Sequence, residues 1–263
     1  MIKIISGWSN KGGSTFALIN LTNELNKFGL DTTFYGPHEW HLDKCKSDKL
    51  QNLKLTEKDI VISHFINLGI RPKVKKIVLF CHEKNLFEVG NMMPFWDEVI
   101  FLNQKQRNYH NRYNGKFRII PNLKEPLSLS IKSEDSKGVA GIIGSIDINK
   151  QTHLSINRAL SEGYNRIILF GNVTDTNYYN SEVKPLIDGQ RVIEYGFISD
   201  KQKMYDMVEA VFLSSKSEVA SLVKDECNST GTIFYGNEST DHDGINLTNE
   251  QIISEWKKVL ELK

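Results

Sequence analysis

The chain has 263 residues, 40% of them hydrophobic and 25% charged, which is ordinary for one large globular domain or two compact ones of roughly 100–150 residues. No apolar stretch approaches the ~20 residues of a membrane span, and the first apolar run is too short for a signal-peptide core. The three cysteines are scattered, which excludes a disulfide framework, and the net charge of +1 comes without the aromatic-laced basic stripe of nucleic-acid-binding proteins. We therefore expect a soluble, cytoplasmic protein that binds no nucleic acid.

Short β-branched and aromatic runs alternate with helical patterns along the first half of the chain. Several of the runs are apolar on both faces, as strands of a buried parallel sheet are. Between the first two runs an apolar face predicts a helix from Phe16 to Phe28, which Gly29 is placed to end. The strands expected in this half are Lys3–Ser6, Thr32–Tyr35, Ile60–His64, Ile77–Cys81, Glu98–Leu102 and Arg118–Pro121.

The second half repeats the alternation. A helix is expected around Leu154 to Leu160, followed by Gly163, and a last helix opens with a capping-box pattern at 248–251. The strands expected here are Val139–Gly144, Arg166–Gly171, Arg191–Tyr195, Ala210–Ser214 and Thr232–Tyr235. Alternating strands and helices predict an α/β protein whose parallel sheets are covered by helices.

The middle of the chain predicts a division into two domains. Residues 122–137 are polar and lack periodicity, as a linker does. We therefore expect two Rossmann-like domains, 1–125 and 136–245, that face a cleft and are joined by a linker at 126–135. The helix within 246–263 is expected to pack back toward the first domain.

The two halves also differ in charge. Residues 1–122 hold 18 Lys and Arg against 11 Asp and Glu, whereas residues 123–263 hold 15 against 21. Two ordinary solvated surfaces would explain this difference. Alternatively the first half meets something anionic, such as lipid phosphate or an acidic glycan, which would make the protein peripheral at a membrane. Lys73, Lys75 and Lys76 are a local concentration of that charge.

A glycine-rich turn follows the first expected strand and opens the first helix. Gly12 and Gly13 let the backbone approach a ligand closely, and a helix N-terminus offers free N–H groups and a positive dipole end. The segment resembles the phosphate loop of deviant-Walker ATPases, but the Gly-Lys pair of that loop is missing because Ser14 and Thr15 follow at once. An ATPase and a tight turn without ligand both stay open at this point.

Two carboxylates lie eight positions apart between the last two expected strands. On one helix, Glu218 and Glu226 would stand about 12 Å apart along the axis and roughly 80° apart around it. So placed, each could accept hydrogen bonds from a hydroxyl pair at one end of a sugar–diphosphate–ribose. The diphosphate would then rest on helix-terminal amides near Ser215–Ser217. A solvated amphipathic helix is the alternative.

The order strand, Ser, Glu-x7-Glu and then Gly231-Thr232 resembles the donor-site signature of retaining glycosyltransferases of family four, which have the GT-B fold. The resemblance runs along nearly the whole chain in the right order, so we identify the chain as a short, divergent member. Its other matches are Gly12-Gly13-Ser14, Ile77 to His82, Ile119 to Asn122, Gly141 to Gly144 followed by Lys150, Tyr195-Gly196-Phe197 and Met204-Tyr205.

The resemblance implies transfer of a sugar from a nucleotide-diphosphate donor to a glycan, lipid-linked or other acceptor, with retention at the anomeric carbon and without metal or cofactor. His82, Lys150 and Glu218 would be the catalytic residues. Lys150 would hold the diphosphate, while Glu218 and His82 would contact the sugar. The donor-binding residues would be Gly12, Gly13, Ser145, Phe197, Ser217 and Glu226, the last binding the ribose.

The chain also departs from the family pattern. Ser145 stands where the family has Arg, Val219-Ala220-Ser221 replaces Gly-Phe-Gly, and Asn172 replaces a glycine. These departures motivate an alternative function, a non-catalytic protein that binds a sugar nucleotide or a glycan.

Other motifs have simpler explanations. Asp241-His242-Asp243 matches a metal motif of the other glycosyltransferase fold, but it follows the last expected strand, where a surface loop is expected. His38 and His41 lack a third ligand and a helical setting. His64 is expected to be a packing residue at a strand end.

Overall fold

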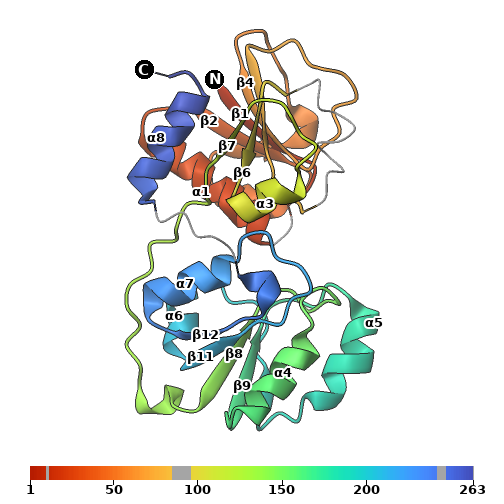
Figure 1. Cartoon of the computed structure of the whole chain (residues 1–263), viewed down its shortest axis with the longest axis vertical. Helices are drawn as coiled ribbons and strands as arrows, with labels where there is room; N and C mark the ends of the chain where they lie inside the picture. Colours follow the sequence, from red (N-terminus) through yellow and green to blue (C-terminus); the bar gives the residue numbers. More distant parts are fainter. Residues whose placement is uncertain (10–11, 85–95, 242–246, 263) are drawn as a thin grey trace. The chain divides into compact units, whose positions relative to one another are not determined.

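The computed structural model describes residues 1–9, 12–84, 96–241 and 247–262. The chain divides into two compact units: Met1–Leu123 together with Asp243–Lys263 forms the first, and Lys124–His242 the second. Each unit has its own parallel sheet covered by helices (Figure 1).

The first unit is built on a seven-stranded parallel sheet in the order β3-β2-β1-β4-β5-β6-β7. The order reverses between β1 and β4, and in such sheets ligands bind outside the carboxyl ends of the strands at this point. The strands are β1 (Ile2–Ser6), β2 (Thr32–Gly36), β3 (Ser47–Lys49), β4 (Ile60–His64), β5 (Lys76–Phe80), β6 (Glu98–Phe101) and β7 (Phe117–Ile119).

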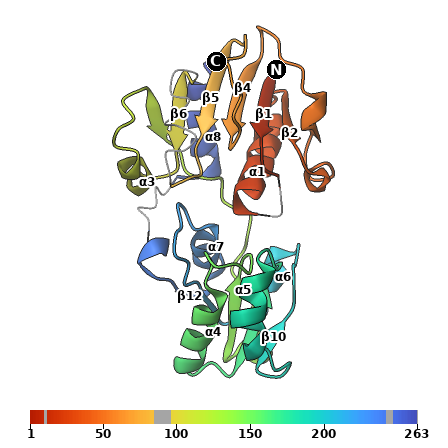
Figure 2. The same cartoon turned by 90° about the vertical axis from the view of Figure 1, so that its right-hand side faces the viewer.

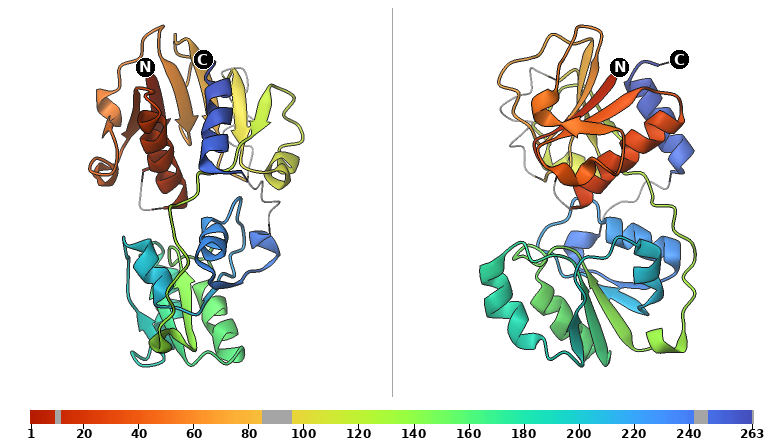
Figure 3. Two further views of the ribbon diagram at one scale, coloured as in Figure 1. Left: turned by 90° about the vertical axis from the view of Figure 1, so that its left-hand side faces the viewer. Right: turned by 180° about the vertical axis from the view of Figure 1, so that it is seen from behind.

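Helices α1 (Gly13–Lys27) and α8 (Asn249–Val259) lie side by side on one face of this sheet (Figure 3, left). Gly29, at φ +76°, ends the first of them, and a capping box at Thr248 begins the second, as the sequence predicts. The opposite face is covered by loops and by α3 (Gln104–Tyr109), with a short 3₁₀ turn at Leu50–Asn52. Another 3₁₀ turn, Glu39–His41, contacts α1, because Trp40 meets the ring of Phe16 edge-on at 5.0 Å between centroids.

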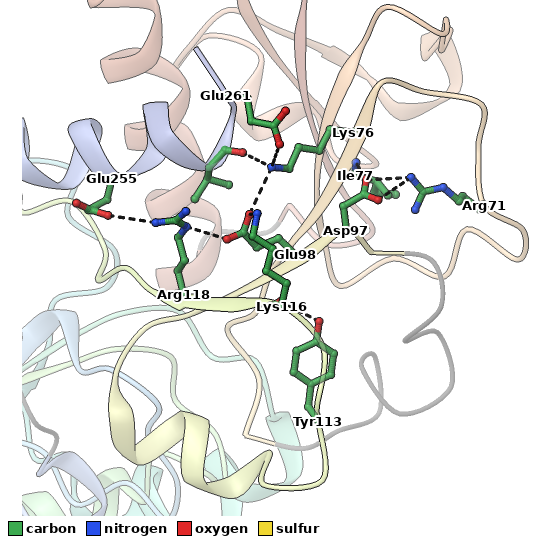
Figure 4. Close-up of polar contacts among 11 residues, drawn as sticks. Arg71, Lys76, Ile77, Asp97, Glu98, Tyr113, Lys116, Arg118, Glu255 and Glu261 are labelled. Carbon is green, nitrogen blue, oxygen red and sulfur yellow. Dashed lines mark hydrogen bonds and ion pairs between the residues drawn. The ribbon is translucent and has the colours of Figure 1, made fainter. Parts of the chain in front are cut away.

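The last helix is attached to the first unit by apolar and by charged contacts. Trp256 is 1% exposed and meets the ring of Phe80 edge-on, at 5.0 Å between centroids. Lys76 donates to the carbonyl oxygen of Val259 and lies 2.9 Å from a carboxylate oxygen of Glu261 (Figure 4).

Beneath this helix, Glu98 is fully buried at the start of β6. Its carboxylate accepts a hydrogen bond from Arg118 at 2.8 Å and is paired with Lys116 at 3.2 Å and Lys76 at 3.4 Å (Figure 4). The expectation that Lys76 adds to a surface concentration of charge with Lys73 and Lys75 is therefore wrong. Its ammonium is turned inward because a buried carboxylate needs compensating charge, whereas the other two lysines are exposed.

The second unit has a five-stranded parallel sheet in the order β10-β9-β8-β11-β12. Its strands are β8 (Val139–Ile143), β9 (Arg166–Phe170), β10 (Val192–Glu194), β11 (Ala210–Phe212) and β12 (Ile233–Tyr235). Its helices are α4 (Thr152–Ser161), α5 (Thr176–Tyr178), which continues as a π turn (Tyr179–Val183) and a 3₁₀ turn (Lys184–Leu186), α6 (Lys201–Asp206) and α7 (Leu222–Thr230), with 3₁₀ turns at Glu134–Ser136 and Glu238–Thr240.

The helices of the second unit cover both faces of its sheet. Helices α4 and α5 lie on one face, and α6 and α7 on the other (Figures 1 and 2). Alternate residues of β9 feed the two cores: Ile167 and Leu169 point to α4, whereas Ile168 and Phe170 point to α6 and α7. These strands are therefore apolar on both faces, as the sequence predicts.

The segment expected as a linker, 126–135, is attached to the second unit. Ser130 donates its backbone N–H to Thr230, and Leu127 packs against the core under α6 and α7. The ammonium of Lys132 donates to the carbonyl oxygens of Tyr205 and Val208, both at 2.7 Å. Side-chain and backbone bonds thus give this polar stretch a fixed path despite its lack of periodicity.

Candidate functional site

In the first unit, the glycine pair lies at the N-terminus of α1. Gly12 is the N-cap in an extended conformation, no side chain caps the helix, and its first turn holds no acidic residue. No described atom lies within 4 Å of where a Cβ on Gly12 would stand. The helix therefore presents its N-terminal amides and dipole beside open space, a setting suited to an anion.

Two histidines, the buried His64 and the half-buried His82, lie at the carboxyl ends of β4 and β5. The rings of His64 and His82 meet edge-on, with centroids 5.0 Å apart. His64 Nδ1 is 2.8 Å from the hydroxyl of Ser6, its register partner on β1, and His82 Nε2 is 3.0 Å from Asn122 Oδ1. The second ring nitrogen of each histidine is buried and has no hydrogen-bond partner among the described residues.

Burial keeps both histidines uncharged near neutral pH. It lowers the pKa of His64 well below its ordinary range, with a further contribution from His82, and it lowers the pKa of His82 to about 4. Neutral imidazoles can hold hydroxyl groups but cannot neutralise a phosphate. His82 thus fits the predicted contact with a sugar, and His64, expected only to pack, belongs to the same cluster.

Next to this pair lies a strained residue that the sequence analysis did not single out. Phe65 follows β4 with φ +43°, a left-handed conformation uncommon for a bulky residue, and its side chain stays 39% exposed. A Cβ on Gly7 would stand 2.3 Å from the carbonyl oxygen of Phe65, so only glycine fits after β1. The sequence signal that could have found this close approach is Gly7 itself, directly after a strand.

In the second unit, Ser145 lies in the turn after β8. Its hydroxyl donates to Asp147 Oδ2 at 2.5 Å, and Asp147 Oδ1 accepts the backbone N–H groups of Asn149 and Lys150, both at 2.9 Å. Ser145 is therefore engaged within its own turn. It supplies no positive charge, so the cation of this turn is Lys150.

Lys150 and Glu218, 68 positions apart in the sequence, form an ion pair. The ammonium lies 2.5 Å from a carboxylate oxygen, and the two side chains are 24% and 12% exposed. The loops that carry them are tied together, because Asn149 accepts the N–H of Lys216 at 2.7 Å and donates its side-chain amide to Ser217 at 3.2 Å. Two residues predicted to bind adjacent parts of a donor, its diphosphate and its sugar, are thus neighbours.

The expectation that Glu218 and Glu226 share one helix is wrong. Helix α7 begins at Leu222, capped by the hydroxyl of Ser221, and Glu218 lies in the preceding loop. No helix starts at Ser215–Ser217 either, because the carbonyl oxygen of Ser215 is held by the side chains of Asn237 and Ser239. These bonds fix the loop in a non-helical path, and the spacing of about 12 Å along one helix axis does not apply.

Glu226 lies on α7 and is 5% exposed. Lys201 Nζ lies 2.6 Å from Glu226 Oε1, and the Tyr205 hydroxyl donates to Glu226 Oε2 at 2.6 Å. The same ammonium lies 2.9 Å from Glu125. Burial lowers the pKa of Lys201, but attraction to Glu226 and Glu125 outweighs it and leaves the pKa raised, so this lysine is charged.

Phe197 and Ser217 are half-buried in loops of the same unit. Phe197 follows Gly196, which has φ +84° and accepts the N–H of Gly171 at 3.0 Å. A Cβ on Gly171 would stand 1.8 Å from the carbonyl oxygen of Gly144, so the loops after β8, β9 and β10 are held close together. Every predicted donor residue of this unit except Glu226, which lies on α7, is therefore on a loop that follows a strand.

The candidate metal motifs show no shared site. His41 is fully buried, with Nε2 3.2 Å from the carbonyl oxygen of Asp48, whereas His38 is exposed. Asp241 pairs with Lys224 at 2.9 Å, and the other two residues of its motif lie outside the described residues. Within the described ranges no three His, Cys, Asp or Glu side chains are grouped to hold a metal, and no helix is long and apolar enough to cross a membrane.

Comparison of the sequence with known protein families and with curated proteins finds no match. Solved structures do resemble the chain. HepE of Anabaena in complex with UDP-glucose gives a TM-score of 0.71 at 14% identity, covering 99% of this chain and 90% of that one. The lipopolysaccharide outer core galactosyltransferase WaaB gives 0.58 at 16% identity, covering 100% and 91%. Sucrose-phosphate synthase from Thermosynechococcus elongatus gives 0.66 at 15% identity, covering 89% and 80%.

The chain has the GT-B fold. The expected fold class, α/β with two Rossmann-like units and parallel sheets, is confirmed. Within this GT-B chain the predicted site residues divide between the units. Gly12, Gly13 and His82 belong to the first, and Ser145, Lys150, Phe197, Ser217, Glu218 and Glu226 to the second.

Proposed function

We propose that this protein is a glycosyltransferase that takes a sugar from a nucleotide-diphosphate donor and transfers it with retention at the anomeric carbon. The observation that carries the proposal is the Lys150–Glu218 pair, which puts a cation and a hydroxyl-binding carboxylate side by side at the carboxyl ends of β8 and β11. A sugar diphosphate presents an anion and a ring of hydroxyls in the same arrangement. The complex of HepE with UDP-glucose makes UDP-linked sugars the first donors to test.

Each residue has a distinct role in this proposal. Lys150 neutralises the charge that develops on the departing diphosphate, which is the main catalytic task when the leaving oxygen itself takes the acceptor proton. Glu218 accepts hydrogen bonds from the sugar hydroxyls. In the first unit, the amides at Gly12 and Gly13 suit an anionic oxygen, and neutral His82 suits a hydroxyl.

Donor binding has to open the Lys150–Glu218 pair. At 2.5 Å the two groups satisfy each other, so a diphosphate competes with Glu218 for the ammonium. Glu218→Gln removes that competition while keeping a hydrogen-bonding side chain. We expect this variant to bind UDP as tightly as the wild type or more tightly, and to bind the intact UDP-sugar more weakly.

The proposal is tested by measuring UDP release from UDP-sugars without acceptor, with EDTA present because no divalent metal is required. Lys150→Met should weaken donor binding by at least tenfold, as expected for loss of a charge-assisted hydrogen bond of about 1.5–3 kcal/mol. Lys184→Met, at an exposed lysine of the same unit, is the matched control. Turnover that EDTA abolishes and manganese restores would contradict the proposal.

A second candidate function is favoured by Ser145. Its hydroxyl is engaged with Asp147, so Lys150 is the one cation that the turn after β8 offers to a diphosphate. A site with this single cation suits a protein that binds a sugar nucleotide without cleaving it. Calorimetric binding of a UDP-sugar with no UDP release over hours would favour this binding protein over the enzyme.

A further inference from the structure

The buried carboxylate of Glu226 is held from two sides. Its two carboxylate oxygens are held by different donors, Lys201 Nζ on one and the Tyr205 hydroxyl on the other, each at 2.6 Å. Both donors come from α6, whereas the carboxylate comes from α7. The side chain of Glu226 is thereby fixed in position and in rotation.

The carboxylate keeps hydrogen-bonding capacity after these two contacts. An ionised carboxylate has about four lone-pair sites, and the contacts from Lys201 and Tyr205 use one site on each oxygen. One site per oxygen remains, and the spacing of the two oxygens suits two neighbouring hydroxyls. A vicinal diol, such as the 2′ and 3′ hydroxyls of a ribose, matches this pattern.

The charge of the group favours the same ligand. Lys201 lies between Glu226 and Glu125, 2.6 Å from the one and 2.9 Å from the other, so the three side chains carry one positive and two negative formal charges. A negative group repels phosphate and accepts neutral hydroxyl donors. The diphosphate is therefore directed to Lys150, and the sugar of the nucleoside to Glu226.

We propose that Lys201 and Tyr205 are positioning residues that hold the Glu226 carboxylate for the ribose diol of the nucleotide, a role that rests on the proposed donor site. Lys201 also joins this carboxylate to Glu125, at the start of the second unit. The protein then selects ribonucleotides over 2′-deoxyribonucleotides through residues that do not touch the ligand.

The test is calorimetry of the full chain with UDP and with 2′-deoxy-UDP. The wild type should bind UDP about tenfold more tightly than its deoxy counterpart. Lys201→Met should weaken the binding of UDP about tenfold and the binding of 2′-deoxy-UDP much less, so that the preference for UDP disappears. Lys201→Arg should restore part of it, and Lys203→Met, at an exposed lysine of the same helix, should leave both affinities unchanged.

Tyr205→Phe provides a second measurement if Lys201→Met does not fold, because it removes one hydroxyl and no charge. It should also reduce the preference for UDP. Equal losses for both ligands in these variants would overturn the positioning role and leave the donor site standing. Tighter UDP binding by Lys201→Met would show that the lysine blocks Glu226. A wild type that binds neither ligand would overturn the proposed function itself.

Discussion

At the scale of single residues, His64 and His82 show how burial sets protonation. The two rings touch in the first unit, and each has one buried nitrogen that no described residue satisfies. A second positive charge beside the first would be opposed both by desolvation and by repulsion. The pair therefore remains neutral, and this has a measurable consequence for stability.

His82 should make the protein less stable as the pH falls from about 6.5 to about 4. Its pKa is lowered to about 4 in the fold, so below pH 6.5 the unfolded chain binds a proton that the folded chain rejects. The resulting loss is roughly 1 kcal/mol per pH unit. Urea denaturation at a series of pH values should show that the free energy of unfolding of His82→Gln depends less on pH over this range. Between pH 7 and 8 the free energies of unfolding of the variant and the wild type should change with pH in the same way. A difference there would contradict the lowered pKa of His82.

At the scale of elements, the N-cap of α7 determines where this helix begins. The run 214–221 contains four serines, and the hydroxyl that accepts a helix N–H belongs to the last of them, Ser221, which bonds the N–H of Lys224 at 3.2 Å. The helix therefore begins after Glu218 and includes only Glu226. One carboxylate of the predicted pair lies on a loop and the other on a helix.

Ser221→Ala should destabilise the second unit by about 1 kcal/mol, because it removes the N-cap of α7. The expected fall in melting temperature is roughly 3–6 °C for a unit of this size. Ser221→Asp keeps a capping oxygen near the helix N-terminus and should melt within about 1 °C of the wild type. If both variants melt alike, the cap does not determine where α7 begins.

At the scale of the whole molecule, the chain ends in the unit where it begins. Residues 243–263 belong to the first unit, and α8 lies on its sheet beside α1. Lys257 stands over the ring of Phe28, 4.8 Å from its centroid, and the buried Glu98 group attaches the end of α8 through Lys76. The C-terminal helix is thus part of the fold of the first unit.

Glu98→Gln should destabilise the first unit by about 3 kcal/mol or more, because it removes the buried negative charge that Lys76, Lys116 and Arg118 share. The matched control is Glu255→Gln, since Glu255 pairs with the same Arg118 at 3.8 Å but is 31% exposed. That surface pair should contribute less than about 1 kcal/mol. Guanidinium denaturation compares the two variants, and equal losses would show that the buried network does not stabilise the unit.

The regular elements and several local signals follow from the sequence. Each of the eleven expected strands is present with ends within two residues, because hydrophobic periodicity and turn residues act over a few positions. The strand that was missed, β3, is Ser47-Asp48-Lys49, which has no apolar residue and pairs only at the edge of its sheet. Its existence depends on β2 rather than on its own composition.

The sequence by itself therefore determined the order of strands and helices, the capping box at Thr248 and the GT-B resemblance. Only the tertiary structure decided which charges meet. Lys150 pairs with Glu218, 68 positions away, because β8 and β11 are neighbours in the sheet. Lys201 pairs with Glu226 because α6 and α7 cover the same face of that sheet. Strand order and helix placement are collective results of burying two apolar faces at once, so no local pattern encodes these partners.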